Sequence, residues 1–397
     1  GNSDDAVGFE LVNAGFALAL LTDQNDASRA WASLQGTADS AAFTGIDDLT
    51  LSSGAMKVLI NAAANDGTVV DYTETDLTVV TGPDSSVTFD MDGAKGELIA
   101  AETSVDIDLF GFFTVSGNVA FEAASATVDL SDGSTAEVDV LTLGGSDLSA
   151  FVGTDAGTAD ALGLSLTGVH FGLAFLTDQA NAQRTWLTLQ ASVGSASFIG
   201  VDGVTVEVNS LEVFINDFAS DSTLVDYSSD SLTVNTGGSN SIVFDIDGKE
   251  GRLLAAAGSL ELTVLGYTLS GDFSFEQSTQ ADGSKTTILS AANITIPGFS
   301  GEGSGSTPIN INNAGGLFIL TDGGMAGVLG FVAESDFGLF SAGANVKLEI
   351  NNTGEAFDVS GAYGAVQLDA GNYTRLVLED LSVAFPGVEI SGDFSFA

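Results

Sequence analysis

An internal repeat limits what this chain can fold into more than any other feature of its sequence. The stretch FALALLTDQNDASRAWASLQ at residues 16–35 returns as GLAFLTDQANAQRTWLTLQ at residues 172–190. Landmark residues recur 155 positions apart: Trp31 and Trp186, Asn61 and Asn216, Tyr72 and Tyr227, Gly93 and Gly248. Self-similarity at a constant period indicates tandem repeats, in which each copy packs on its neighbours.

The repeat predicts three modules, at residues 1–155, 156–300 and 301–397. The third is a shorter, divergent copy, which opens with GGLFILTDGG at residues 315–324 and closes with VEISGDFSFA at residues 388–397. We expect the array to continue beyond both ends of this sequence.

Alternation of apolar and polar residues dominates within the modules. In VTVEVNSLEVFIN (204–216) and SLELTVLGYTLSGDFSF (259–275), most apolar residues recur at every second position, which is the period of a β-strand. The 49 glycines and only 4 prolines are typical of many strands joined by tight turns. We therefore predict an all-β fold, an elongated rod of tandem modules built from short antiparallel strands, because stacking covers strand edges that one module leaves exposed.

The repeated stretch itself is a candidate for either a duplicated active site or a duplicated piece of scaffold. Its alternation predicts strand, polar turn and strand, with Arg29 able to pair with Asp23, and Arg184 with Asp178, across the turn. The third copy keeps LTD at residues 320–322 but has neither the arginine nor the tryptophan. We therefore interpret the stretch as the opening hairpin of each module.

The charge excludes several classes of partner. The chain carries 54 Asp plus Glu against 9 Lys plus Arg, a formal net charge of −45. Nucleic acids and anionic lipids are bound through clusters of Lys and Arg, which this sequence lacks. Self-repulsion of this size suits a saline or cation-rich medium, where salt screens it.

Location follows from charge and repetition rather than from cysteine, which is absent. We expect an extracellular protein. No transmembrane segment is predicted, since AGFALALL (14–21), among the longest apolar runs, is far shorter than the ~20 residues that span a bilayer.

Catalytic motifs are missing from the sequence. His170 is the single histidine, and Gly15 occupies its position in the first module, so neither a histidine-based triad nor a multi-histidine metal site can be built. Paired carboxylates could support glycosidase chemistry, but any acidic surface supplies such pairs. We expect no enzymatic activity.

Calcium is the one cofactor for which candidate ligands exist. FDMDG (89–93) and FDIDG (244–248) place Asp90 beside Asp92 and Asp245 beside Asp247, two residues apart on one strand face. Such carboxylates could supply oxygens to Ca²⁺; the alternative is an Asp-Gly hairpin turn with solvated acids. Weaker candidates are Asp47, Asp48 and Asp202.

Three phrases resemble tandem modules of very large bacterial surface and secreted proteins of the giant adhesin or exoprotein type. They are VDVLTLGGSDLSAFVGT (138–154), GTADALGLSLTGVHFGLAFLTD (157–178) and FIGVDGVTVEVNSLEVFIN (198–216). The resemblance implies a cell-surface or extracellular location, β-rich tandem modules and a structural or adhesive role. It implies no catalytic residues.

Three functions remain open on these grounds. The first is a structural segment of an extracellular filament, stalk or adhesin, whose partners are copies of itself or neighbouring repeats. The second is a Ca²⁺-assisted module that binds surface glycans through Trp31 and Trp186. The third is a hydrophobic β-groove that carries lipid, lined by residues such as Phe273 and Phe275, although core packing is the simpler interpretation of those rings.

Overall fold

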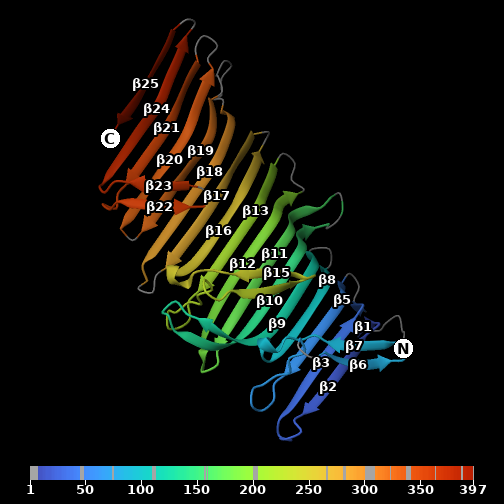
Figure 1. Ribbon diagram of the computed structural model, residues 1–397. Helices are drawn as coiled ribbons and strands as arrows, with labels where there is room; N and C mark the ends of the chain where they lie inside the picture. The colour runs from blue at the N-terminus through green and yellow to red at the C-terminus, as the bar shows by residue number, and fades with distance from the viewer. Residues whose placement is uncertain are drawn as a thin grey trace. The chain divides into compact units, whose positions relative to one another are not determined.

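A computed structural model confirms the predicted all-β, antiparallel fold (Figure 1). It describes residues 8–44, 49–73, 76–109, 113–155, 158, 160–199, 204–264, 267–279, 283–299, 309–321, 323–336, 341–362, 364–385 and 388–396. The only helical elements within these ranges are two 3-10 turns, η1 (Gly93–Lys95) and η2 (Gly248–Glu250). Among the described residues, no helix has the length and apolar character needed to cross a membrane.

Nineteen strands are assigned to one large antiparallel sheet, and three hairpins form separate two-stranded sheets. The first part of the chain contributes β1 (Gly8–Val12), β2 (Gly15–Thr22), β3 (Ala30–Ala38), β4 (Ser40–Thr44), β5 (Leu49–Ala62), β8 (Leu98–Leu109), β9 (Phe113–Asp129), β10 (Thr135–Thr154), β11 (Leu162–Asp178), β12 (Asn181–Ile199) and β13 (Val204–Asp217). The later part contributes β16 (Arg252–Val264), β17 (Tyr267–Thr279), β18 (Lys285–Phe299), β19 (Ile309–Thr321), β20 (Gly324–Asp336), β21 (Ser341–Asn351), β24 (Tyr373–Phe385) and β25 (Val388–Phe396). The hairpins are β6–β7 (Leu77–Gly82, Ser85–Phe89), β14–β15 (Leu232–Gly237, Asn240–Phe244) and β22–β23 (Phe357–Gly361, Gly364–Leu368).

The chain divides into two compact units, which do not coincide with the three predicted modules. The first unit holds residues 1–194 and 215–250, and the second holds residues 195–214 and 251–397. In the first unit β2, β3, β5, β8, β9, β10 and β11 pair successively. In the second unit β16 to β21 and then β24 and β25 do the same. Each unit is therefore a meander, from which a hairpin departs and returns.

The sequence period of 155 recurs in the strand boundaries. Hairpin β14–β15 begins and ends 155 residues after hairpin β6–β7, and η2 follows η1 by the same interval. The first 3-10 turn, η1, begins after Asp92, whose carboxylate caps it. The third copy keeps the arrangement in shorter form, since β22–β23 stands between β21 and β24. Figure 1 shows β22 and β23 lying across the direction of the sheet strands.

A buried asparagine anchors the loop at which the hairpin leaves the sheet. Asn216 donates a hydrogen bond from Nδ2 to the carbonyl oxygen of Val225 at 3.1 Å, and Asn61 does the same to Val70 at 2.8 Å. Asn351 in the third copy donates to the carbonyl oxygens of Glu355 and Asp369. Since a buried amide without partners is costly, this residue fixes the path of the loop and with it the place of the hairpin.

The sheet has two different faces. Along β10, Val138 and Val140 are buried on the face that the hairpins cover, which we call the core face. Leu141 and Leu143 point to the opposite side, which we call the open face, and both remain about 40% exposed (41% and 40%). Alternation along β10 therefore assigns apolar residues to both faces, as in strands that are buried on both sides.

Candidate functional site: the joint between successive repeats

Hairpins β14–β15 and β22–β23 each pack on strands of their own repeat and on the last strands of the preceding repeat. We call this place the joint. In joint one, within the first unit, β14–β15 lies on β9 and β10 of the first repeat and on β11 of the second. In joint two, within the second unit, β22–β23 lies on β18 of the second repeat and on β19 and β20 of the third.

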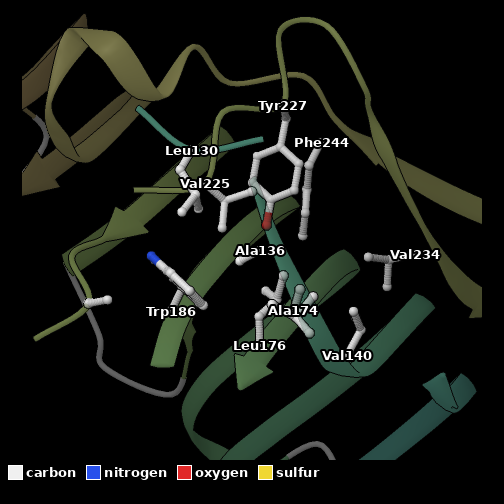
Figure 2. Packing of buried hydrophobic residues seen from close by; sticks show 12 residues of the cluster. Leu130, Ala136, Val140, Ala174, Leu176, Trp186, Val225, Tyr227, Val234 and Phe244 are labelled. Carbon is white, nitrogen blue, oxygen red and sulfur yellow. The ribbon is translucent and has the colours of Figure 1, made fainter. Parts of the chain in front are cut away.

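The core of joint one is assembled from both repeats. Figure 2 shows the rings of Tyr227 and Phe244 over small side chains of β10 and β11, among them Ala136 and Ala174. The first repeat contributes Leu130, Ala136, Val138 and Val140. The second contributes Ala174, Leu176, Trp186, Ala219, Val225, Tyr227, Val234 and Phe244. Neither repeat completes this core alone.

Two paired glycines allow the hairpin to approach the sheet. Gly144 of β10 lies opposite Gly172 of β11. A Cβ atom on Gly144 would lie 2.1 Å from the carbonyl oxygen of Asn235, and one on Gly172 would lie 3.3 Å from the Cβ atoms of Val234 and Ile242. The absence of these side chains therefore sets the spacing between the two layers.

Buried hydrogen bonds hold the tip of the hairpin. The Ser146 hydroxyl is fully buried and lies 3.1 Å from the carbonyl oxygens of both Thr236 and Gly237, to which it donates. It also accepts a hydrogen bond from the Asn240 side chain at 3.4 Å. Because a hydroxyl in an apolar core must find partners, these contacts fix the hairpin in one position on β10.

The turn between β9 and β10 is bonded to the loop that precedes β14. Leu130 and Val225 form an isolated antiparallel bridge. The backbone N–H of Ser131 donates to the carbonyl of Leu224, and the N–H of Asp226 donates to the carbonyl of Asp129, both at 2.9 Å. These backbone bonds, between segments almost a hundred residues apart, add a second attachment to joint one.

Asp226, at this attachment, has an unusually low pKa. Burial disfavours its ionised form, but hydrogen bonds from the Lys249 ammonium, from Ser228 and from the Gly248 N–H outweigh burial and lower its pKa from 3.8 to about 2. Asp71 holds the same position in the first repeat, where Ala94 replaces Lys249. Its pKa is lowered by Thr73 and Gly93 without a cation.

Joint two repeats the design with a different division of small residues. Leu317 and Ile319 of β19 and Ala326 of β20 pack against Val366 and Leu368 of β23, with Ile288 of β18 at the edge of the cluster. Here the glycine is in the hairpin: a Cβ atom on Gly361 would lie 3.0 Å from Leu317 and 3.2 Å from Ile288. Ser290 of β18, which lies opposite Leu317 of β19, is also near this position, with its hydroxyl oxygen 3.4 Å away.

The repeated Arg and Trp serve as scaffold. The predicted ion pairs are present, with Arg29 3.2 Å from Asp23 and Arg184 2.9 Å from Asp178. Each guanidinium also lies 4.8 Å from the ring centroid of the following tryptophan, whose indole N–H donates to a loop carbonyl, Thr68 or Thr223. A second carboxylate near each arginine, Asp66 or Asp221 at 2.7 Å, was not predicted. Their 155-residue spacing could have revealed them.

The predicted calcium ligands have protein partners. Asp90 forms an ion pair with Lys57 at 3.0 Å. Asp92 accepts a hydrogen bond from the Ala94 N–H and Asp247 from the Lys249 N–H, while Asp245 is exposed. Asp47, Asp48 and Asp202 lie outside the described residues. Within the described part of the chain no three His, Cys, Asp or Glu side chains are grouped to hold a metal, and calcium binding stays a prediction.

His170 and the two phenylalanines are not members of the two joint cores. The His170 ring accepts a hydrogen bond from the Asp147 N–H at 3.4 Å, a local contact within the β10–β11 pair. Phe273 and Phe275 belong to the open face of the second unit, and the expectation of core packing was wrong for Phe273, which is 36% exposed. Both rings line an apolar groove of about 500 Å³ with Leu289, Phe318 and other residues.

The sequence contained a signal for joint one that was not interpreted. The pair Gly144 and Gly145, followed by Ser146, interrupts a long alternating strand. Glycine inside a strand marks a close approach of another backbone, which is its role here.

Comparison with protein-family models finds no match, and comparison with curated proteins finds no similar sequence.

Replacing Gly144 by alanine is expected to destabilise the first unit by about 1–3 kcal/mol, because the new methyl group overlaps Asn235. The measurement is the free energy of unfolding in urea. Gly36→Ala is the matched control, since its Cβ would meet nothing closer than 3.7 Å, and a gain of about 0.4–1 kcal/mol is expected there. Equal effects of the two changes would contradict the close approach of hairpin and sheet.

Acid is expected to weaken joint one through Asp226. Because its folded-state pKa of about 2 lies below its ordinary value of 3.8, its ionised form contributes about 2 kcal/mol of stability above pH 4, which is lost as the pH falls from about 4 to about 2. Asp226→Asn should flatten the pH dependence of the unfolding free energy in that window. Asp71 lacks a lysine partner, so Asp71→Asn should flatten the pH dependence less. A larger effect of Asp71→Asn than of Asp226→Asn would contradict the role given to the Lys249–Asp226 pair.

Proposed function

We propose that this chain is a structural segment of an extracellular array, of the filament, stalk or surface-adhesin type, in which repeats stack in series. The observation that supports this function is the joint. A hairpin laid over the preceding repeat occurs in both compact units. In the first unit two repeats build the apolar core, and in the second unit Ile288 of the preceding repeat packs against the core of the third repeat. Cores shared between neighbours couple repeats mechanically, because one repeat cannot separate from the next without exposing apolar surface.

The surface chemistry supports the same role. The chain's 54 Asp plus Glu far outnumber its 9 Lys plus Arg. The protein therefore suits a saline medium, in which salt screens the repulsion between its carboxylates. The repeated Arg, Trp and Asp residues hold turns together rather than forming a site for a substrate. A segment of an array needs no catalytic group.

Solution scattering tests serial stacking. A compact globule of this length would have a radius of gyration of about 21 Å, and repeats in a row are expected to give a clearly larger value that is independent of protein concentration. A value near that of a globule, measured at a salt concentration that screens the charge, would contradict the proposed function.

A second candidate function is binding of an apolar ligand such as a lipid chain, favoured by the groove around Phe273 and Phe275. Its described lining is almost free of polar groups, with Gly258 and Gly316 leaving the hollow between the rings. A contiguous apolar surface of this kind is rarely exposed to water unless a ligand or partner covers it.

Lipid extraction followed by mass spectrometry tests this second function. Leu289→Lys, on the groove, is expected to remove bound lipid. Leu141→Lys is the matched control, since Leu141 has nearly the same exposure (41% against 40%) on the open face of the other unit. Purified protein that carries no lipid, or that loses lipid equally in both variants, would contradict it.

A further inference from the structure

The open face of the second unit changes in character along β16, β17 and β18. Three successive rows of side chains, which the register places opposite one another, show the change. The first row lies in the apolar groove and consists of Ala256, Phe275 and Leu289. The second row is uncharged and partly polar, and consists of Leu254, Gln277 and Thr287. The third row consists of Arg252, Thr279 and Lys285.

The third row brings two cations to one end of the groove. Arg252 and Lys285 are both exposed, on β16 and β18, and the buried Thr279 of β17 lies between them. They are two of the chain's 9 Lys plus Arg. Lys285 is four residues from Leu289 on the same strand, which is about 14 Å at the rise of an antiparallel strand. The fold thus groups cations that the sequence keeps apart.

The corresponding row of the first repeat carries the opposite charge. By the repeat period of 155, Glu97 stands in the place of Arg252. By register, Asp139 stands in the place of Lys285, since each lies opposite the residue of the middle strand, which is Ser125 in the first unit. Both acids line a hollow of about 390 Å³ together with apolar residues, among them Ile99, Leu141 and Phe175. Two acids beside an apolar hollow in the first unit are therefore two cations in the second.

We propose that the groove of the second unit binds a single-chain amphiphile with an anionic head group, a fatty-acid anion. The inference rests on the second candidate function, the binding of an apolar ligand, and names the chemical class of that ligand. The chain lies in the groove, whose volume of about 500 Å³ holds roughly 16 methylenes if each takes about the 30 Å³ share of a water molecule. The carboxylate lies against Arg252 and Lys285.

The residues around the groove favour this ligand over other amphiphiles. The described residues that line the groove carry no charge, so the chain meets only apolar and neutral groups there. In the row between groove and cations, the Gln277 side chain donates a hydrogen bond to the Thr287 hydroxyl at 3.0 Å, and neither group repels a carboxylate. Two cations can hold one anionic head group, whereas an anionic membrane surface is bound by clusters of about four to eight.

Calorimetric titration of the full chain with decanoate tests the proposal, with decanol as the neutral ligand of equal chain length. The buffer is at about pH 8, where carboxylates are ionised, with about 0.15 M salt, where the Debye length of about 8 Å screens repulsion from distant acids. Decanoate is expected to bind at one site, about threefold to tenfold more tightly than decanol, because two exposed ion pairs contribute about that much.

Two variants that each remove one positive charge separate the head-group contact from general electrostatics. Lys285→Gln is expected to weaken decanoate binding about threefold and to leave decanol binding unchanged, which also shows that the groove is intact. Lys57→Gln is the matched control, because Lys57 belongs to the other unit and pairs there with Asp90. It is expected to change neither affinity. Equal effects of the two variants on decanoate binding would overturn the proposal.

The titrations distinguish this ligand from the function on which it rests. Equal affinities of the unchanged protein for decanoate and decanol would overturn the head-group contact and leave a groove for neutral apolar ligands. Binding of neither compound, as expected if a second copy of the chain covered the groove, would overturn both.

Discussion

The packing of one repeat's hairpin on the strands of the repeat before it is the contact on which the rest of this structure depends. A single antiparallel sheet has no core until a second layer covers one of its faces. Here the layer is thin, one two-stranded hairpin per repeat, and a hairpin alone is at most marginally stable. Sheet and hairpin therefore gain their stability from the interface between them, which in joints one and two includes residues of two repeats.

Polar anchors decide where this layer lies. The buried amide of Asn216 fixes the loop before the hairpin, and Ser146 fixes its tip. Each would be costly without partners, so the arrangement is specified by a few hydrogen bonds as much as by apolar area. The equivalent amides of Asn61 and Asn351 show that the loop anchor is common to all three copies, whereas the contacts of the tip differ.

Period and alternation were enough to predict the fold class. The antiparallel strands, the hairpin character of the Arg–Trp stretch and its ion pairs follow from local pattern, because pairs such as Arg184 and Asp178 are close in sequence. The joint could not be predicted in this way. Contacts such as Ser146 with Thr236 join segments about ninety residues apart, and nothing in either segment identifies the other. The hairpin's approach to Gly144 depends on a layer that alternation does not reveal.

The open face could not be predicted from local pattern either. Period-two alternation predicts that one side of a strand is buried, yet Leu141 and Phe273 are large apolar residues on the other side. A sequence with apolar residues on both faces resembles that of a strand covered on both sides. Local pattern alone could not distinguish Phe273 as a groove residue from Phe273 as a core residue.

The two joints place a small residue in different layers. In joint one Gly144 and Gly172 of the strands leave room for the backbone of Asn235 and for the side chains of Val234 and Ile242, whereas in joint two Gly361 of the hairpin leaves room for Leu317 and Ile288 of the strands. Each hairpin therefore fits the strands on which it lies. A larger side chain in one layer is tolerated only with a compensating change in the layer opposite it.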